Sequence, residues 1–108
     1  MSQTVTIDTL RTLAHGSISG TYAAVGTATT GMTRLVCITN NTNADCTFST
    51  NGTADQLFVA QGSFKLFDLN TNRQTSDQLW VLPTGTQFYV ATAGSATSGS
   101  VYVEVLYG

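Results

Sequence analysis

The chain has 108 residues, of which 9% are charged, and a formal net charge of −2 at pH 7. A chain of this length forms one domain and can bury a core without disulfides or metals. It has 4 Lys and Arg residues in total. That is too few to neutralise the phosphates of a nucleic acid or to hold the chain on an acidic membrane, so we expect neither partner.

The residue types favour strands over helices. Glu, Lys and Arg, which usually build helical surfaces, are scarce, whereas Thr, Val, Tyr and Phe suit a pleated sheet. Turn signals recur at the short spacing that is typical of sandwiches and barrels. The sequence therefore predicts an all-β fold, an antiparallel β-sandwich that is jelly-roll-like.

The first segment is either a strand or an extended arm. Residues 3–7 alternate Thr with Val and Ile, and we expect an N-terminal arm over residues 1–12 and a single β-sandwich domain over 13–108. Residues 1–13 contain no apolar run and no basic leader, which predicts no signal peptide and folding in a cytosol. The small, polar stretch 26–33 is expected to be a surface loop.

A nearly apolar run follows at residues 34–39 (RLVCIT). It predicts a central strand that is covered on both sides, or one that lies between two sheets. Residues 40–45 are expected to form a polar turn, followed by strands at 46–50 and 57–60. Between these strands, Asn51-Gly52 predicts a tight hairpin with positive φ at both residues.

Residues 63–69 alternate well, with Phe64 and Leu66 on one face and Lys65 and Phe67 on the other. After a polar loop at 70–77, a strand is expected at 79–82, where Pro83 ends it. Another strand is expected at 87–91.

The last strand has the clearest pattern in the chain. In residues 100–107, the alternate residues from Val101 to Tyr107 form one apolar face, which predicts the core side. Tyr102, Glu104 and Leu106 lie on the opposite face. Because that face is only partly polar, it indicates either the second layer of the domain or a contact with another chain.

The sequence contains no catalytic constellation that we can recognise, so we expect no enzyme and no cofactor. His15 is the single histidine, and its proximity to Ser17 does not make that serine a nucleophile. His15, Cys37 and Cys46 show no metal-ligand spacing, so we expect no zinc site. For the two cysteines, free thiols are preferred to a disulfide. The aspartates occur singly in separate loops, where capping of turns is the favoured role, although distant loops of a jelly roll can gather around calcium.

Two further features allow a functional interpretation. Trp80 is the only tryptophan, and because it lies in an apolar run we favour core packing over a stacking platform for a sugar. Residues 68–73 end a strand with several turn-stabilising side chains. This loop is either a contact loop or, as we prefer, a self-capped turn.

The order of strand and turn motifs resembles the small virion proteins of tailed bacteriophages, in particular the capsid decoration (cement or staple) proteins of podovirus-like phages. The resemblance spans residues 13–107, and the segments that carry it are 34–42, 51–55, 62–63, 68–72, 83–90 and 97–104. It implies a jelly-roll-like domain on the outer capsid surface of the virion that bridges capsomers after synthesis in the host cytoplasm. The implied partners are the major capsid protein and further copies of the chain, as a dimer or trimer.

The family offers no functional motif to transfer, so contact residues are chosen from the pattern alone. They are Tyr102 and Leu106 on the last strand and Asn70, Asn72 and Arg73 in the loop that follows residues 63–69. Two alternatives remain open: a tail-fibre or baseplate component of the virion, and a carbohydrate-binding module. The aromatic residues available to such a module, most of which alternate into expected core positions, are Trp80, Tyr22, Tyr89, Tyr102 and Tyr107.

Overall fold

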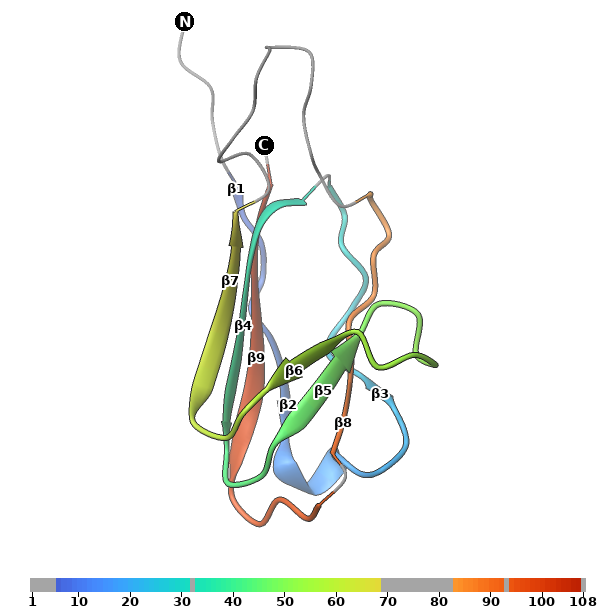
Figure 1. The fold of residues 1–108 in the computed structure, drawn as a ribbon. Helices are drawn as coiled ribbons and strands as arrows, with labels where there is room; N and C mark the ends of the chain where they lie inside the picture. The colour runs from blue at the N-terminus through green and yellow to red at the C-terminus, as the bar shows by residue number, and fades with distance from the viewer. Residues whose placement is uncertain (1–5, 32, 69–82, 93, 108) are drawn as a thin grey trace, which may run out of the picture.

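The computed structural model describes residues 6–31, 33–68, 83–92 and 94–107 and folds them into two antiparallel sheets, which pack as a β-sandwich (Figure 1). The first sheet contains β1 (Thr6–Ile7), β2 (Arg11–Ala14), β4 (Thr33–Thr42), β7 (Ser63–Asp68) and β9 (Gly99–Tyr107). The second contains β3 (Ala23–Ala24), β5 (Cys46–Ser49), β6 (Leu57–Val59) and β8 (Tyr89–Ala91). A short 3₁₀ turn, η1 (His15–Ser17), follows β2.

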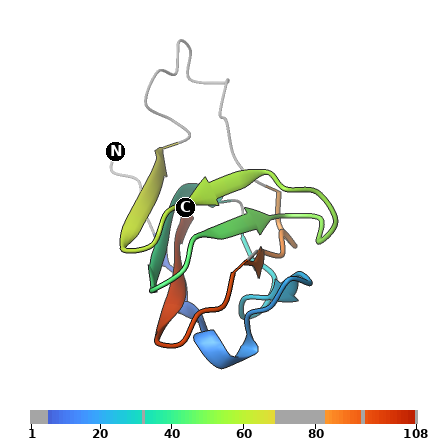
Figure 2. The same ribbon diagram turned by 60° about the horizontal axis from the view of Figure 1, so that its bottom comes forward.

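The strand pairing is that of a long hairpin folded over itself. Strands β2 and β9, β3 and β8, β4 and β7, and β5 and β6 are paired, so the chain returns along its own path. Folding of this ribbon places β2, β9, β4 and β7 side by side in one layer and β3, β8, β5 and β6 in the other (Figures 1 and 2). This is the order of a jelly roll, and the predicted β-sandwich is confirmed.

The core lies between the layers and is built by alternation. Val101, Val103 and Val105 of β9 are fully buried, as the spacing of the apolar residues predicts. Val36 and Ile38 of β4 are their cross-strand neighbours. The second sheet contributes Phe48, Val59 and Val90 from β5, β6 and β8.

Strand β4 differs from its prediction on one side. It is central, with β9 and β7 as neighbours, but only its inward residues are buried. Leu35, Cys37 and Thr39 point away from the core and are half-buried, so the strand is covered on one face and not on both. Residues 34–39 are mostly apolar because both faces of β4 carry apolar side chains: the inward ones lie in the core, and the outward ones belong to the largely apolar outer side of the sheet.

The predicted tight hairpin at Asn51-Gly52 is wrong. Gly52 has a φ of 77°, but no residue other than glycine has a positive φ in the described ranges, and the connection spans residues 50–56. Asn51 works through its side chain instead, because its Oδ1 accepts hydrogen bonds from the N–H groups of Thr53 and Ala54. The asparagine side chain thus replaces a backbone carbonyl, as in other Asx turns.

Arg11 fastens the N-terminal strands to the loop after β3. Its side chain is 3% exposed and donates hydrogen bonds to the carbonyls of Thr9, Thr27 and Ala28 and to Asp8 Oδ2, at distances from 2.7 to 3.3 Å. The described part of residues 1–12, which the sequence suggests as an arm, lies along β9 of the same chain.

The Asp8–Arg11 pair predicts a dependence of stability on pH. The hydrogen bond from Arg11, and then that from the Thr9 N–H, lower the pKa of Asp8 below its usual value. A lowered pKa in the folded state stabilises the protein above the unfolded-state value of about 3.9, and this contribution is lost as pH falls through the folded pKa. We therefore expect the urea midpoints of wild type and Asp8→Asn to differ at neutral pH and to converge in acid. A difference independent of pH would contradict this role.

Candidate functional site

The outward side of the five-stranded sheet carries several large apolar side chains over four neighbouring strand positions. Strand register places its residues in rows: Ile7, Leu106, Leu35 and Asp68 in the first, Glu104, Cys37 and Leu66 in the second, and Tyr102, Thr39 and Phe64 in the third. We call the six large apolar or aromatic residues of these rows the outer apolar face. They are Ile7, Leu35, Phe64, Leu66, Tyr102 and Leu106.

Several of these side chains are open to solvent. Ile7 is 75% exposed, Phe64 64% and Leu66 55%, while Leu35, Tyr102 and Leu106 are half-buried. Exposed apolar residues are normal when they are scattered, but a contiguous patch marks an interaction surface. The edge strand β7 contributes two of the most exposed side chains of the face.

Glu104 is the charged residue in the middle row. It is exposed, lies between Tyr102 and Leu106 along β9, and pairs with Cys37 across to β4. A partner that covers this face would have to offer a cation or hydrogen-bond donors to Glu104, because an unpaired buried carboxylate is costly. The chemistry that the face offers is therefore binding to an apolar surface with a basic or donor group near its centre.

The structure brings together two of the five residues that the sequence suggests as contacts. Tyr102 and Leu106 both lie on the outer apolar face, in its first and last rows. Asn70, Asn72 and Arg73 lie outside the described residues, as does Trp80. The sequence analysis missed Ile7, Leu35, Phe64 and Leu66 as members of the face, although the alternation of residues 63–69 already separates Phe64 and Leu66 from the core side.

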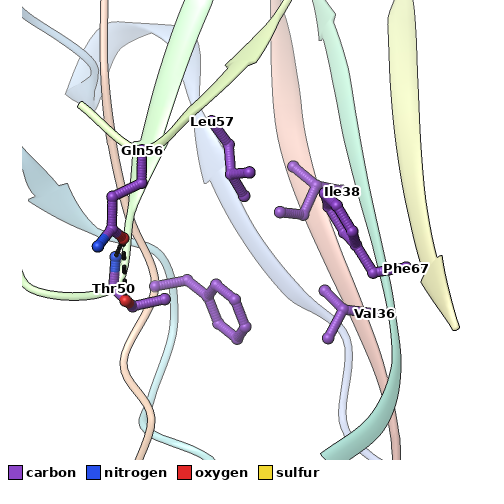
Figure 3. A pocket seen from close by; sticks show the side chains of 7 residues that line it. Val36, Ile38, Thr50, Gln56, Leu57 and Phe67 are labelled. Carbon is purple, nitrogen blue, oxygen red and sulfur yellow. Dashed lines mark hydrogen bonds between the residues drawn. The ribbon is translucent and has the colours of Figure 1, made fainter. Parts of the chain in front are cut away.

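A second apolar feature is a gap of about 210 Å³ between the two sheets, on the side where β6 and β7 lie. Figure 3 shows Val36, Ile38 and Phe67 on one side of this gap and Leu57 on the other. At its rim, Gln56 Oε1 accepts hydrogen bonds from the Thr50 N–H and hydroxyl. The gap can hold an apolar group, and its described lining contains no titratable side chain.

Both cysteines are free, in agreement with the preferred prediction. Cys37 points outward from the five-stranded sheet, whereas Cys46 is fully buried in the second sheet. Burial raises the pKa of the Cys46 thiol. Cys46 therefore packs as a small apolar side chain.

The remaining candidate groups have local partners. His15 is part of η1 and its Nδ1–H donates to the carbonyl of Gly99 at 3.2 Å. Asp8 accepts the Thr9 N–H, which is the local capping role expected of aspartate, whereas Asp45 accepts the N–H of Gln61, sixteen residues away. Within the described ranges, no group of three or more His, Cys, Asp or Glu side chains is placed to hold a metal ion. That part of the chain also contains no helix long and apolar enough to span a membrane.

Comparison of the chain with protein-family models, curated proteins and solved structures finds no match. The fold itself does not select a function, because jelly rolls occur in capsid proteins, lectins and enzymes alike. A functional proposal for this chain therefore has to rest on its surfaces.

Proposed function

We propose that this protein is a structural component of a phage virion that binds the outer capsid surface through its outer apolar face and stabilises the shell by bridging capsomers. The observation that carries the proposal is the outer apolar face itself, which spans β1, β9, β4 and β7. An apolar face of this kind gains free energy when another surface removes it from water. The resemblance of the sequence to capsid decoration proteins suggests that the surface covering this face is that of the capsid shell.

The composition supports attachment to a broad protein surface. Only 9% of residues are charged, so few long charged side chains would lose conformational freedom on docking. Thr39 and Asn41 of β4 lie on the same outward side and offer neutral hydrogen bonds. Glu104 gives the contact a preferred orientation, because it requires a donor at one place on the shell.

The size of the face favours several copies acting together. Three strand spacings of about 4.8 Å and the stretch of β9 from Tyr102 to Leu106, at about 3.3 Å per residue, give a projected area of roughly 240 Å². A standard interface buries about 800 Å² on each partner. A single copy would therefore bind weakly, and a dimer or trimer that presents two or three faces to neighbouring capsomers would gain by avidity.

Stabilisation of the shell follows from linkage. A protein that binds the assembled, expanded shell and not its separated subunits adds RT ln(1 + [L]/Kd) per site, or about 2.7 kcal/mol at a hundredfold excess over Kd. Cosedimentation of the purified protein with empty shells, before and after expansion, tests this. Saturable binding to expanded shells with a raised melting temperature is the expected result. Binding to isolated tails and not to shells would make the protein a tail component and overturn the proposal.

A charge placed in the outer apolar face should weaken shell binding. We expect Leu66→Glu to weaken binding to expanded shells at least tenfold, because a carboxylate would be buried against an apolar partner. Lys65→Glu is the matched control, since Lys65 is the next residue of the same strand and is paired with the inward-facing Ile38. The dissociation constants of both variants, measured by cosedimentation, decide the point. Equal loss in both variants would show that the outer apolar face is not the contact.

A further inference from the structure

The opposite side of the sandwich carries a hollow that the proposed shell contact does not use. It has a volume of about 330 Å³ and opens on the outward face of the four-stranded sheet. Thr47 of β5 is paired with Phe58 of β6 on one side and with Ala91 of β8 on the other, so these three side chains share that face. The small, buried Ala91 lies at the bottom of the hollow, and the ring of Phe58, which is 52% exposed, forms one of its sides.

The far side of the hollow is held in place by hydrogen bonds. The phenol of Tyr22 donates to Asp55 Oδ1, and its oxygen lies 3.2 Å from Thr47 Oγ1. This contact ties the loop before β3 to the loop between β5 and β6. Desolvation, together with the hydrogen bond to Asp55, raises the pKa of Tyr22 above its ordinary value. The positions of ring and carboxylate are thereby fixed before any ligand arrives.

The polar groups of the hollow are mainly acceptors. Asp45 and Asp55 both line it, and each already accepts one hydrogen bond through Oδ1, from the Gln61 N–H and from Tyr22 respectively. None of the described residues that line it is Lys, Arg or His. Each carboxylate can still accept further hydrogen bonds, and an exposed aromatic ring lies beside them. This combination suits a ligand with several hydroxyl donors and one apolar face, whereas the negative charge of the carboxylates disfavours an anion.

We infer that this hollow binds a neutral pyranose sugar, whose C–H face packs on Phe58 while its hydroxyls donate to the carboxylates of Asp45 and Asp55. The volume, at the lower end of that of small-molecule sites, limits the ligand to about one ring. A single ring of this kind in an open hollow binds with a Kd on the order of 1 mM. The inference goes beyond the proposed shell contact and uses the other face of the molecule, so the two can be bound at the same time.

Titration of the ¹⁵N-labelled full chain by NMR tests the inference. The probes are methyl β-D-galactopyranoside and methyl β-D-glucopyranoside, each compared with its acidic counterpart, galacturonic or glucuronic acid. We expect saturable shifts of the amides of Thr47, Asp55, Phe58 and Ala91 with at least one neutral probe, and at least fivefold weaker binding of its acidic counterpart. Absence of shifts up to about 50 mM, far above the expected Kd, would overturn the inference. Equal binding of the acidic probe, or tighter binding of argininamide, would overturn it as well.

Phe58→Ala should weaken binding of the neutral sugar at least tenfold. Phe64→Ala is its matched control, because Phe64 is also an exposed phenylalanine but lies on the outer apolar face. If Phe58→Ala kept its affinity for the sugar, the ring of Phe58 would not contact the ligand, and the inference would be contradicted. Because Phe58→Ala leaves the outer apolar face intact, it should still bind shells, so the failure of one proposal is distinguishable from the failure of the other.

Discussion

Replacement of Arg11 by methionine is expected to lower the free energy of unfolding by about 3 kcal/mol or more. Methionine keeps much of the apolar stem but removes every donor of the guanidinium. The carbonyls of Thr9, Thr27 and Ala28 and the carboxylate of Asp8 would then lose the hydrogen bonds that Arg11 gives them. Urea unfolding followed by tryptophan fluorescence or circular dichroism measures the change.

The Arg11→Lys variant separates charge from geometry. An ammonium keeps the positive charge but cannot reproduce the planar fork that reaches three carbonyls and a carboxylate. We expect this variant to lose most of the stability that Arg11→Met loses. Full stability of Arg11→Lys would show that the charge alone matters, which would contradict the role given to the hydrogen bonds.

Replacement of Asn40 by alanine is expected to cost about 2–4 kcal/mol. Asn40 is fully buried in β4, and its Nδ2 donates to the carbonyls of Ala44 and Val59, each at 2.9 Å. Its Oδ1 accepts the N–H and the hydroxyl of Thr42. Loss of this amide leaves the Val59 carbonyl and the Thr42 N–H without these partners and loosens the turn that carries the chain from one sheet to the other.

The neighbouring Asn41 provides a matched control. It has the same side chain, lies in the same strand and is exposed. We expect Asn41→Ala to change the free energy of unfolding by no more than about 0.5 kcal/mol, as is usual for surface sites. Similar losses in the two variants, measured by urea unfolding, would mean that burial of the Asn40 network is not the source of its effect.

Apolar alternation predicts which side chains of β9 and β7 share a face of the sheet. In β9 and β7 the period of two assigns each side chain to the correct face, because both strands are regular over their described lengths. The even spacing of strands and turns also predicts a sandwich of jelly-roll type. The order of the strands within each layer is not among these predictions, because it depends on pairing between strands that are far apart in the sequence.

Buried polar residues are the part of the fold that the sequence does not reveal. The sequence places Asn40 at the start of a polar turn, but in the structure it lies within β4 with its side chain in the core. Burial of its amide is possible because the amide hydrogen-bonds to the carbonyls of Ala44 and Val59. Arg11 reads as a residue of a solvated arm, yet the carbonyls of a loop sixteen and seventeen residues away make its burial favourable. Partners of this kind are set by tertiary structure, and no local pattern encodes them.

The outer apolar face is predictable only in part for the same reason. Tyr102 and Leu106 stand out because their strand has a clear core face opposite them. Ile7 and Leu35 join them through the register of three strands that are far apart in the sequence. The hollow at Phe58 also depends on pairing across β6, β5 and β8, which the sequence does not specify.

The central claim is that the outer apolar face is the surface that contacts the shell. Hydroxyl-radical footprinting of the protein, free and bound to expanded shells, tests it at single side chains. The account predicts that Phe64, Leu66 and Tyr102 become protected on binding, whereas Phe58, on the opposite layer, stays as reactive as in the free protein. Protection of Phe58 with unchanged reactivity of Phe64 and Leu66 would contradict the account, because it would place the shell on the other side of the sandwich.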